Sequence, residues 1–132
     1  MIGIDTNVLV RFLVDDDEHQ NTVAHSFMSE RTVESPAFLS AIALAETVWV
    51  LHRQMEYPMS NIITMLQALL SADNLIIEHT EELDMLINGD GEPKGDLADH
   101  LIAWFGAKAG CTKSVTFDRK AARSVPGMEL LQ

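Results

Sequence analysis

Short apolar runs alternate with longer stretches of mixed polarity along the whole chain. Residues 1–4 are apolar and precede an acid, which is typical of a short buried parallel strand, and the apolar run 8–14 predicts a helix after it. The acidic start of residues 15–31 suits the first turn of a second helix, because negative side chains stabilise a helix N-terminus. The chain therefore begins as a strand followed by two helices.

The middle of the chain repeats this order of strand and helix. Residues 32–39 predict a second strand, and Ser40 suits the N-cap of an apolar helix that Pro58 ends. Ser60 suits the N-cap of a further helix, and residues 74–78 predict a third strand.

The last part of the chain continues the alternation. A helix is expected over residues 80–88, followed by a polar turn rich in Gly and Pro over residues 89–95. Residues 96–108 predict another helix, and residues 113–117 and 128–131 predict strands. Strands that alternate with helices indicate a parallel sheet covered on both faces. The predicted fold class is therefore α/β, with a central parallel sheet of four to five short strands flanked by helices.

Length and composition indicate one folded domain over residues 1–132. The chain is long enough to bury a core without a disulfide, and its 47% hydrophobic and 22% charged residues are close to globular averages. The single cysteine, Cys111, offers no thiolate cluster for zinc. Because no uncharged run reaches the length of a membrane span and no signal-peptide pattern begins the chain, we expect a cytoplasmic protein with no membrane partner.

Isolated acids on apolar segments are the main chemical signal. Glu46 is the only charged residue between Pro36 and Leu51, and no Lys or Arg lies within a helical turn of it. A carboxylate carried into an apolar interior costs several kcal/mol unless it is paired, protonated or metal-bound. The same isolation recurs at three further acids. They are Asp5, Asp99 and Asp118. We therefore expect the four acids to share one cation.

The expected positions of these acids favour a common site. Asp5 and Asp118 follow predicted strands, and ligands of open parallel sheets bind beyond the strand C-termini. If Glu46 and Asp99 project from helices toward the same edge, all four carboxylates converge. Oxygen-only ligands favour Mg²⁺, with Mn²⁺ as the alternative. Asp96 lies three residues before Asp99, so it suits either a helix N-cap or support of the metal, and the two roles are compatible.

Net charge constrains how a nucleic acid would be held. The formal charge of −11 argues against binding through a broad basic surface, because such binding depends on neutralising phosphates with Lys and Arg. Bound divalent cations and a few basic side chains are one way to hold such a substrate. A basic partner protein is the other natural complement to this charge.

Four segments in order resemble the motifs of PIN-domain ribonucleases, and their spacing is most similar to VapC-type toxins of toxin–antitoxin pairs. The segments are IDTNVLVRFL, AIALAETVW, DLADHLIAWFGAKAGC and TFDRKAARSVPGMELL. By this resemblance Asp5, Glu46, Asp99 and Asp118 occupy the acidic positions of the family. Three polar residues match positions that help to order metal-bound water. They are Thr6, Asn7 and Thr116. The DLAD segment presents two acids, so Asp96 and Asp99 could exchange roles.

The resemblance implies a Mg²⁺-dependent endoribonuclease toxin that hydrolyses a structured RNA such as a transfer RNA. A small antitoxin with a basic C-terminal segment would neutralise it, which fits the −11 charge. We expect a homodimer, with most of the large apolar residues, including Trp49, in the core. Candidate RNA-positioning side chains, each also suited to a solvated surface role, are Arg11, Arg53, Lys94 and Arg119.

Three other function classes are weighed against this one. A haloacid-dehalogenase-like phosphatase also has an Asp after its first strand, but it needs a second Asp two residues on, where this chain has Asn7. A receiver-like binding domain pairs strand-end acids with a buried Lys, for which Lys113 is poorly placed. A non-catalytic PIN-type scaffold is the third, and the presence of all four acids argues against it.

Overall fold

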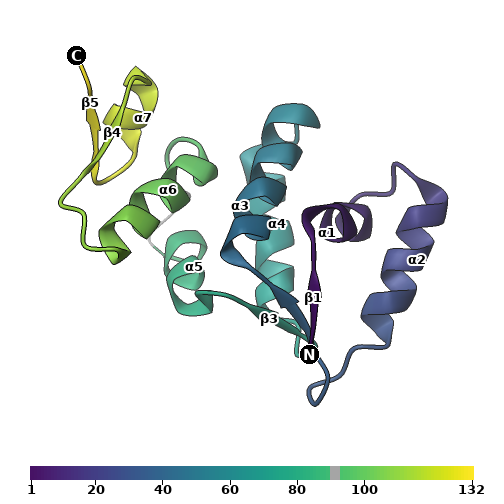
Figure 1. The fold of residues 1–132 in the computed structure, drawn as a ribbon. Coiled ribbons are helices and arrows are strands. Elements are labelled where there is room, and N and C mark those ends of the chain that lie inside the picture. Colours follow the sequence, from purple (N-terminus) through teal and green to yellow (C-terminus); the bar gives the residue numbers. More distant parts are fainter. Residues whose placement is uncertain (90–92) are drawn as a thin grey trace. The chain divides into compact units, whose positions relative to one another are not determined.

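The computed structural model describes residues 1–89 and 93–132, and the predicted turn at residues 89–95 falls partly outside this range. The chain divides into two compact units, Met1–Gly91 (unit 1) and Glu92–Gln132 (unit 2). Figure 1 draws the helices and strands of both units.

Unit 1 contains a parallel sheet of three short strands in the order β1-β2-β3. The strands are β1 (Ile2–Ile4), β2 (Ala37–Leu39) and β3 (Leu75–Ile77). Their register aligns Ile4 with Leu39 and Leu39 with Ile77. The central strand is the most buried, since Ala37 and Leu39 are both 0% exposed. The residues that follow the three strands therefore form a row along one edge of the sheet.

Three helices of unit 1 begin after a residue whose side chain accepts a backbone hydrogen bond, and two begin without such a side-chain cap. They are α1 (Thr6–Leu13), α2 (Glu18–Ser29), α3 (Ala41–Trp49), α4 (Met59–Leu70) and α5 (Thr80–Ile87), with the π-helical turn η1 (Val50–Gln54) extending α3. Fully buried Leu and Ile side chains fill the space between these elements and the sheet. The largest are Leu9, Leu39, Leu44, Leu51, Ile62 and Leu66.

Unit 2 contains two helices and a pair of parallel strands, β4 and β5. The elements are α6 (Leu97–Lys108), β4 (Ser114–Thr116), α7 (Arg119–Ser124) and β5 (Met128–Leu130). Helix α6 packs closely on β4 because Gly106 has no side chain there, and an added Cβ would lie 2.9 Å from Ser114 Oγ. The chain reverses at Gly110, whose φ of +102° suits glycine.

The predicted α/β class is confirmed, and the differences lie in element boundaries and in how the strands are grouped into sheets. The strands of the described residues fall into a three-stranded and a two-stranded sheet. The predicted strand 32–39 is shorter, because Ser35 N donates to Thr32 Oγ1 and closes a turn before β2. The predicted N-cap at Ser60 is wrong, since α4 begins at Met59 after Pro58. Among the described residues, no helix combines the length and apolar character that crossing a bilayer requires.

Candidate active site

Asp5 lies at the edge of the unit 1 sheet where β1 ends and α1 begins. Its Oδ1 accepts a hydrogen bond of 2.9 Å from Val8 N, so the carboxylate is the N-cap of α1. Ser40 holds the equivalent place after β2, where its Oγ accepts from Ala43 N at 3.2 Å and caps α3. Since neighbouring strands lie about 4.8 Å apart, these two capping residues are close neighbours on the edge.

Glu78, which sequence reasoning missed, completes this row after β3. Its Oε1 accepts a hydrogen bond of 2.8 Å from Ala41 N, the first residue of α3, although the two residues are 37 apart in the chain. Glu78 therefore ties the end of β3 to the start of the helix that carries Glu46. The available signal was a carboxylate directly after the apolar run Leu75–Ile77, the same pattern that singled out Asp5.

We expect Glu78→Ala to destabilise unit 1 by about 1 kcal/mol, the usual value of a helix-capping acceptor. The backbone amide of Ala41 would lose its acceptor. Glu78→Gln keeps an acceptor oxygen and should therefore lower the stability less. Urea unfolding followed by circular dichroism measures both variants. The matched control is Glu81→Ala, another exposed acid, in the first turn of α5. Equal stability of Glu78→Ala and wild type would contradict a structural role for this hydrogen bond.

Glu46 is exposed, so the expectation that it is carried into an apolar interior is wrong. Helix α3 buries Leu44, Thr47 and Val48 on one side, while its other side presents Glu46 between two exposed apolar side chains. These are Ile42, 81% exposed, and Trp49, 46% exposed, which also places Trp49 outside the core. From Ser40 to Glu46 is about 9 Å along the helix axis, at 1.5 Å per residue.

In unit 2, Asp96 and Asp118 are both helix N-caps. Asp96 Oδ1 accepts from Ala98 N at 3.0 Å, which confirms the predicted capping role at the start of α6. Asp118 Oδ1 accepts from Lys120 N at 2.8 Å and from Ala121 N at 3.1 Å. Asp118 thus caps the helix after β4 as Asp5 caps the helix after β1, although Phe117 lies between β4 and Asp118. For Asp5 and Asp118, the capping bonds use Oδ1, so Oδ2 takes no part in these bonds.

Asp99 is half-buried in the first turn of α6. Because the chain reverses between α6 and β4, the two elements run in opposite directions. The start of α6, with Asp99, and the end of β4, with Asp118, therefore lie toward the same end of unit 2. In unit 1, the structure thus places Asp5 near the start of α3. In unit 2, it places Asp99 toward the same end as Asp118.

Two polar contacts fix the backbone around these acids. Thr116 Oγ1 accepts from Asp118 N at 3.0 Å and so holds the turn between β4 and α7. His100 is buried, 9% exposed, and its Nε2 lies 2.6 Å from the carbonyl oxygen of Lys94. That bond ties the segment before α6 to the helix.

The remaining supporting residues flank Asp5. Thr6 is buried, whereas Asn7 is exposed. Asp5 and Asn7 line a groove of about 720 Å³ that runs beside β1, between α1 and α2. Its walls are mainly apolar, with Ile2, Val8 and Phe27 among the lining residues.

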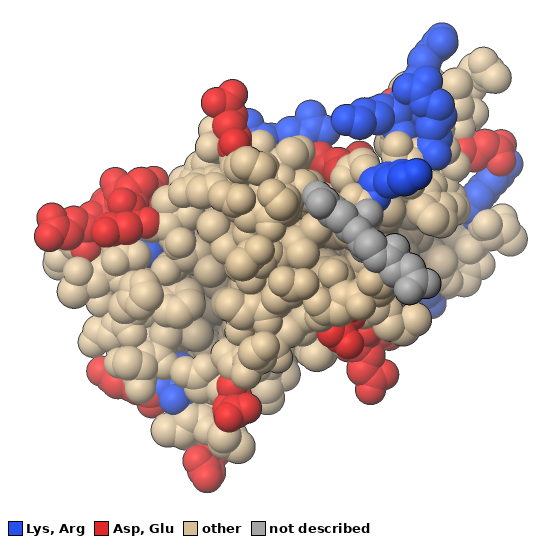
Figure 2. Space-filling view, turned by 180° about the vertical axis from the view of Figure 1, so that it is seen from behind, with Lys and Arg blue, Asp and Glu red and all other residues tan. Residues whose placement is uncertain are grey.

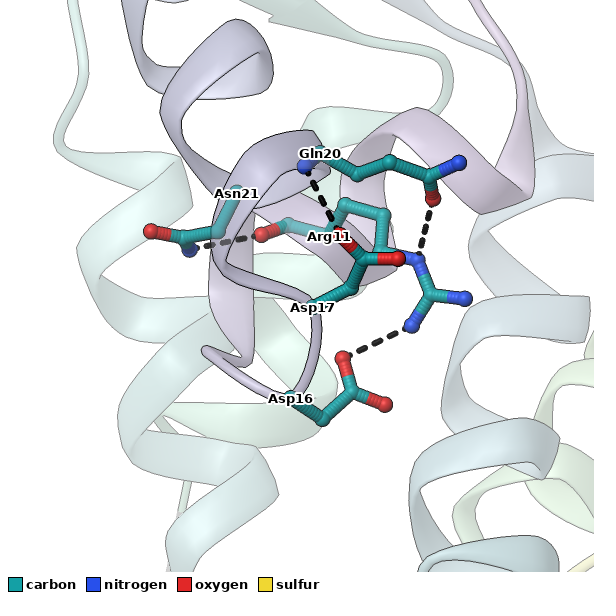
Figure 3. Close-up of polar contacts among 5 residues, drawn as sticks. All are labelled: Arg11, Asp16, Asp17, Gln20 and Asn21. Carbon is teal, nitrogen blue, oxygen red and sulfur yellow. Dashed lines mark hydrogen bonds and ion pairs between the residues drawn. The ribbon is translucent and has the colours of Figure 1, made fainter.

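The side chain of Arg11 forms hydrogen bonds with other residues of unit 1 (Figure 3). Its Nε donates to Gln20 Oε1 and its Nη1 donates to Asp16 Oδ1, both at 2.7 Å. Asn21 Nδ2 in turn donates to the Arg11 carbonyl oxygen at 2.8 Å. These bonds join α1 to the start of α2, which is capped by Asp17. A structural role for Arg11 therefore competes with its predicted role in positioning RNA.

The other candidate RNA-positioning side chains lie at the surface. Arg53 is exposed in η1, and Lys94 and Arg119 are exposed in unit 2. Their contact with RNA stays a prediction.

Comparison with known families decides the classification. The family model described as PIN domain matches residues 2–125, nearly the whole chain. The chain belongs to the PIN domain family. No curated protein gives a match. Since PIN domains are generally nucleases, the match favours a nuclease over the phosphatase alternative.

The acids of this PIN domain suit a hard divalent cation, the kind of metal that PIN domains typically use. All of the candidate ligands are carboxylates, and the Oδ2 atoms of Asp5 and Asp118 lie outside the hydrogen bonds that cap α1 and α7. Asp5 and Glu46 belong to unit 1, whereas Asp99, Asp118 and the supporting Asp96 belong to unit 2. Within the described ranges, no three His, Cys, Asp or Glu side chains form a group that could hold a metal ion. The convergence of all four acids stays a prediction.

Proposed function

We propose that this PIN domain is a Mg²⁺-dependent endoribonuclease that hydrolyses RNA phosphodiester bonds, with Mn²⁺ as the alternative metal. The family match over residues 2–125 carries the proposal. The acids support it, because Asp5 and Asp118 each follow a parallel strand, where α/β folds bind their ligands.

The proposed metal ligands are Asp5, Glu46, Asp99 and Asp118, with Asp96 in support. When bound, a divalent cation lowers the pKa of a coordinated water and stabilises negative charge on the leaving oxygen. The part of the protein is to hold the ligands in place before the substrate arrives. Capping bonds fix the carboxylates of Asp5 and Asp118, and the Thr116 bond to Asp118 N fixes the turn that carries the latter.

We further propose that the enzyme is a VapC-type toxin of the cytoplasm, neutralised by a cognate antitoxin and acting as a homodimer. The motif order described above supports this finer class. A structured RNA such as a transfer RNA is the proposed substrate. The basic segment of an antitoxin would complement the many acids of unit 1.

Chelation is the direct test of metal dependence. We expect purified protein to cleave a labelled RNA in Mg²⁺, to stop when EDTA is in excess, and to recover when Mg²⁺ is restored. Gel analysis of the cleavage products measures this, with heat-treated protein as the control for contaminating ribonucleases. Cleavage that persists in EDTA would contradict the proposed chemistry. No cleavage under any metal condition would favour the non-catalytic scaffold instead.

A further inference from the structure

Basic residues are unevenly divided between the two units, which the total of −11 conceals. Residues 1–91 contain 3 Lys and Arg against 15 Asp and Glu, a formal charge of −12. Residues 92–132 contain 6 Lys and Arg against 5 Asp and Glu, a formal charge of +1. Figure 2 shows most of the blue Lys and Arg side chains gathered in one region of the surface. The sequence argument from total charge therefore holds for unit 1 but not for unit 2.

Helix α7 carries three exposed basic side chains that form no ion pair with a described residue. Of the cations described in unit 1, Arg11 pairs with Asp16 and Arg31 pairs with Glu30. In unit 2, Lys113 pairs with Glu129 at 2.9 Å. By contrast, no ion pair with a described residue involves the exposed side chains of α7. These side chains are Arg119, Lys120 and Arg123.

The three cations of α7 share one side of the helix. At about 100° per residue, Arg119, Arg123 and Lys120 fall within an arc of about 100°. Ala121, the buried residue of α7, points to the other side. The helix is therefore anchored by Ala121 and presents a basic side to its surroundings.

An exposed aromatic residue precedes this basic helix in the chain. Phe117 is 79% exposed, and only Asp118 separates it from Arg119. Side chains alternate along β4, with Ser114 and Thr116 half-buried and Val115 54% exposed, so Phe117 continues the exposed face of the strand. A ring exposed in this way presents a face on which a nucleic-acid base could stack.

We propose that Phe117 and the basic side of α7 form a binding platform for a single-stranded segment of the RNA substrate. The cations neutralise successive phosphates and the ring stacks on a base, the combination by which proteins hold single strands. Asp118 lies between the ring and the cations in sequence, so the platform delivers the bound strand to one of the proposed metal ligands. The inference rests on the proposed ribonuclease function for the identity of the ligand.

Binding must be measured apart from cleavage. Fluorescence anisotropy of a labelled single-stranded RNA in EDTA, with the full-length Asp5→Asn protein, reports affinity alone. We expect Phe117→Ala to weaken binding about tenfold, the usual loss for one stacked base, with an unchanged salt dependence. Phe117→Trp should keep the affinity, because it keeps a stacking ring. Ile102→Ala, which truncates another exposed apolar residue of unit 2, is the matched control.

The cations are tested by salt dependence. We expect the combined change of Arg119, Lys120 and Arg123 to Gln to lower the slope of log K against log salt by about 2, at about 0.7 per phosphate contact on a single strand. Lys113→Gln, which removes a paired charge, should leave the slope near that of wild type.

Several outcomes would overturn the platform. One is an unchanged salt slope in the triple variant. Another is a lower melting temperature of Phe117→Ala with unchanged RNA affinity, because that result would make Phe117 a packing residue. A face that binds an acidic protein would likewise leave RNA affinity unchanged in all variants. RNA binding without cleavage by wild type would contradict the nuclease and leave the platform standing, whereas cleavage with unaffected binding would do the reverse.

Discussion

Asp5→Asn should lower the rate of RNA cleavage by at least about 100-fold, since a metal ion supplies several kcal/mol of transition-state stabilisation and each 1.4 kcal/mol is a factor of ten. The variant removes the negative charge and one metal-binding oxygen. It should fold normally, because Asn is as good an N-cap as Asp and can still accept the bond from Val8 N. Single-turnover cleavage in Mg²⁺ measures the rate. In cells, expression of wild type should arrest growth and the variant should not.

Asp17→Asn is the matched control for this experiment. Asp17 caps α2 through a 2.9 Å bond from Gln20 N, so the substitution makes the same chemical change at another capping position. We expect its cleavage rate to equal that of wild type. Equal activity of Asp5→Asn and Asp17→Asn would show that Asp5 acts only as a helix cap and would remove it from the proposed site.

Asp99→Asn should also lose at least about 100-fold in cleavage rate, by the same free-energy argument. Asp96→Asn should stay within roughly threefold of wild type, because Asn keeps the cap on Ala98 N. Comparing the two variants in one cleavage assay decides which acid of the DLAD segment binds the metal. Thermal melting serves as the folding control. A larger loss in Asp96→Asn than in Asp99→Asn would reverse the assignment.

The class of fold and the position of most elements follow from the sequence because their signals are local. Apolar runs predict β1 and β3, and side chains that accept backbone hydrogen bonds predict the starts of α3 and α6. The shortened strand before β2 depends on the turn that Thr32 closes with Ser35, a local bond that competes with strand pairing.

The surroundings of the acids were harder to predict. The run around Glu46 is apolar on both the buried and the exposed side of α3, so periodicity gave no sign that Glu46 lies between exposed Ile42 and Trp49. Glu78 was missed because its partner, Ala41 N, is remote in sequence. Capping by Asp5 and Asp118 also shows that a lone acid after a strand has a local structural role whether or not it binds metal.

If RNA is the substrate, as proposed, the opposite charges of the two units would orient it while it is still approaching. A polyanion is repelled by residues 1–91 and drawn to residues 92–132, so encounters are biased toward the second before any contact forms. Such steering acts over the Debye length, which falls from about 10 Å at 0.1 M salt to about 3 Å at 1 M. At high salt the collisions would lose this bias. The association rate constant would then fall even though every side chain kept its place.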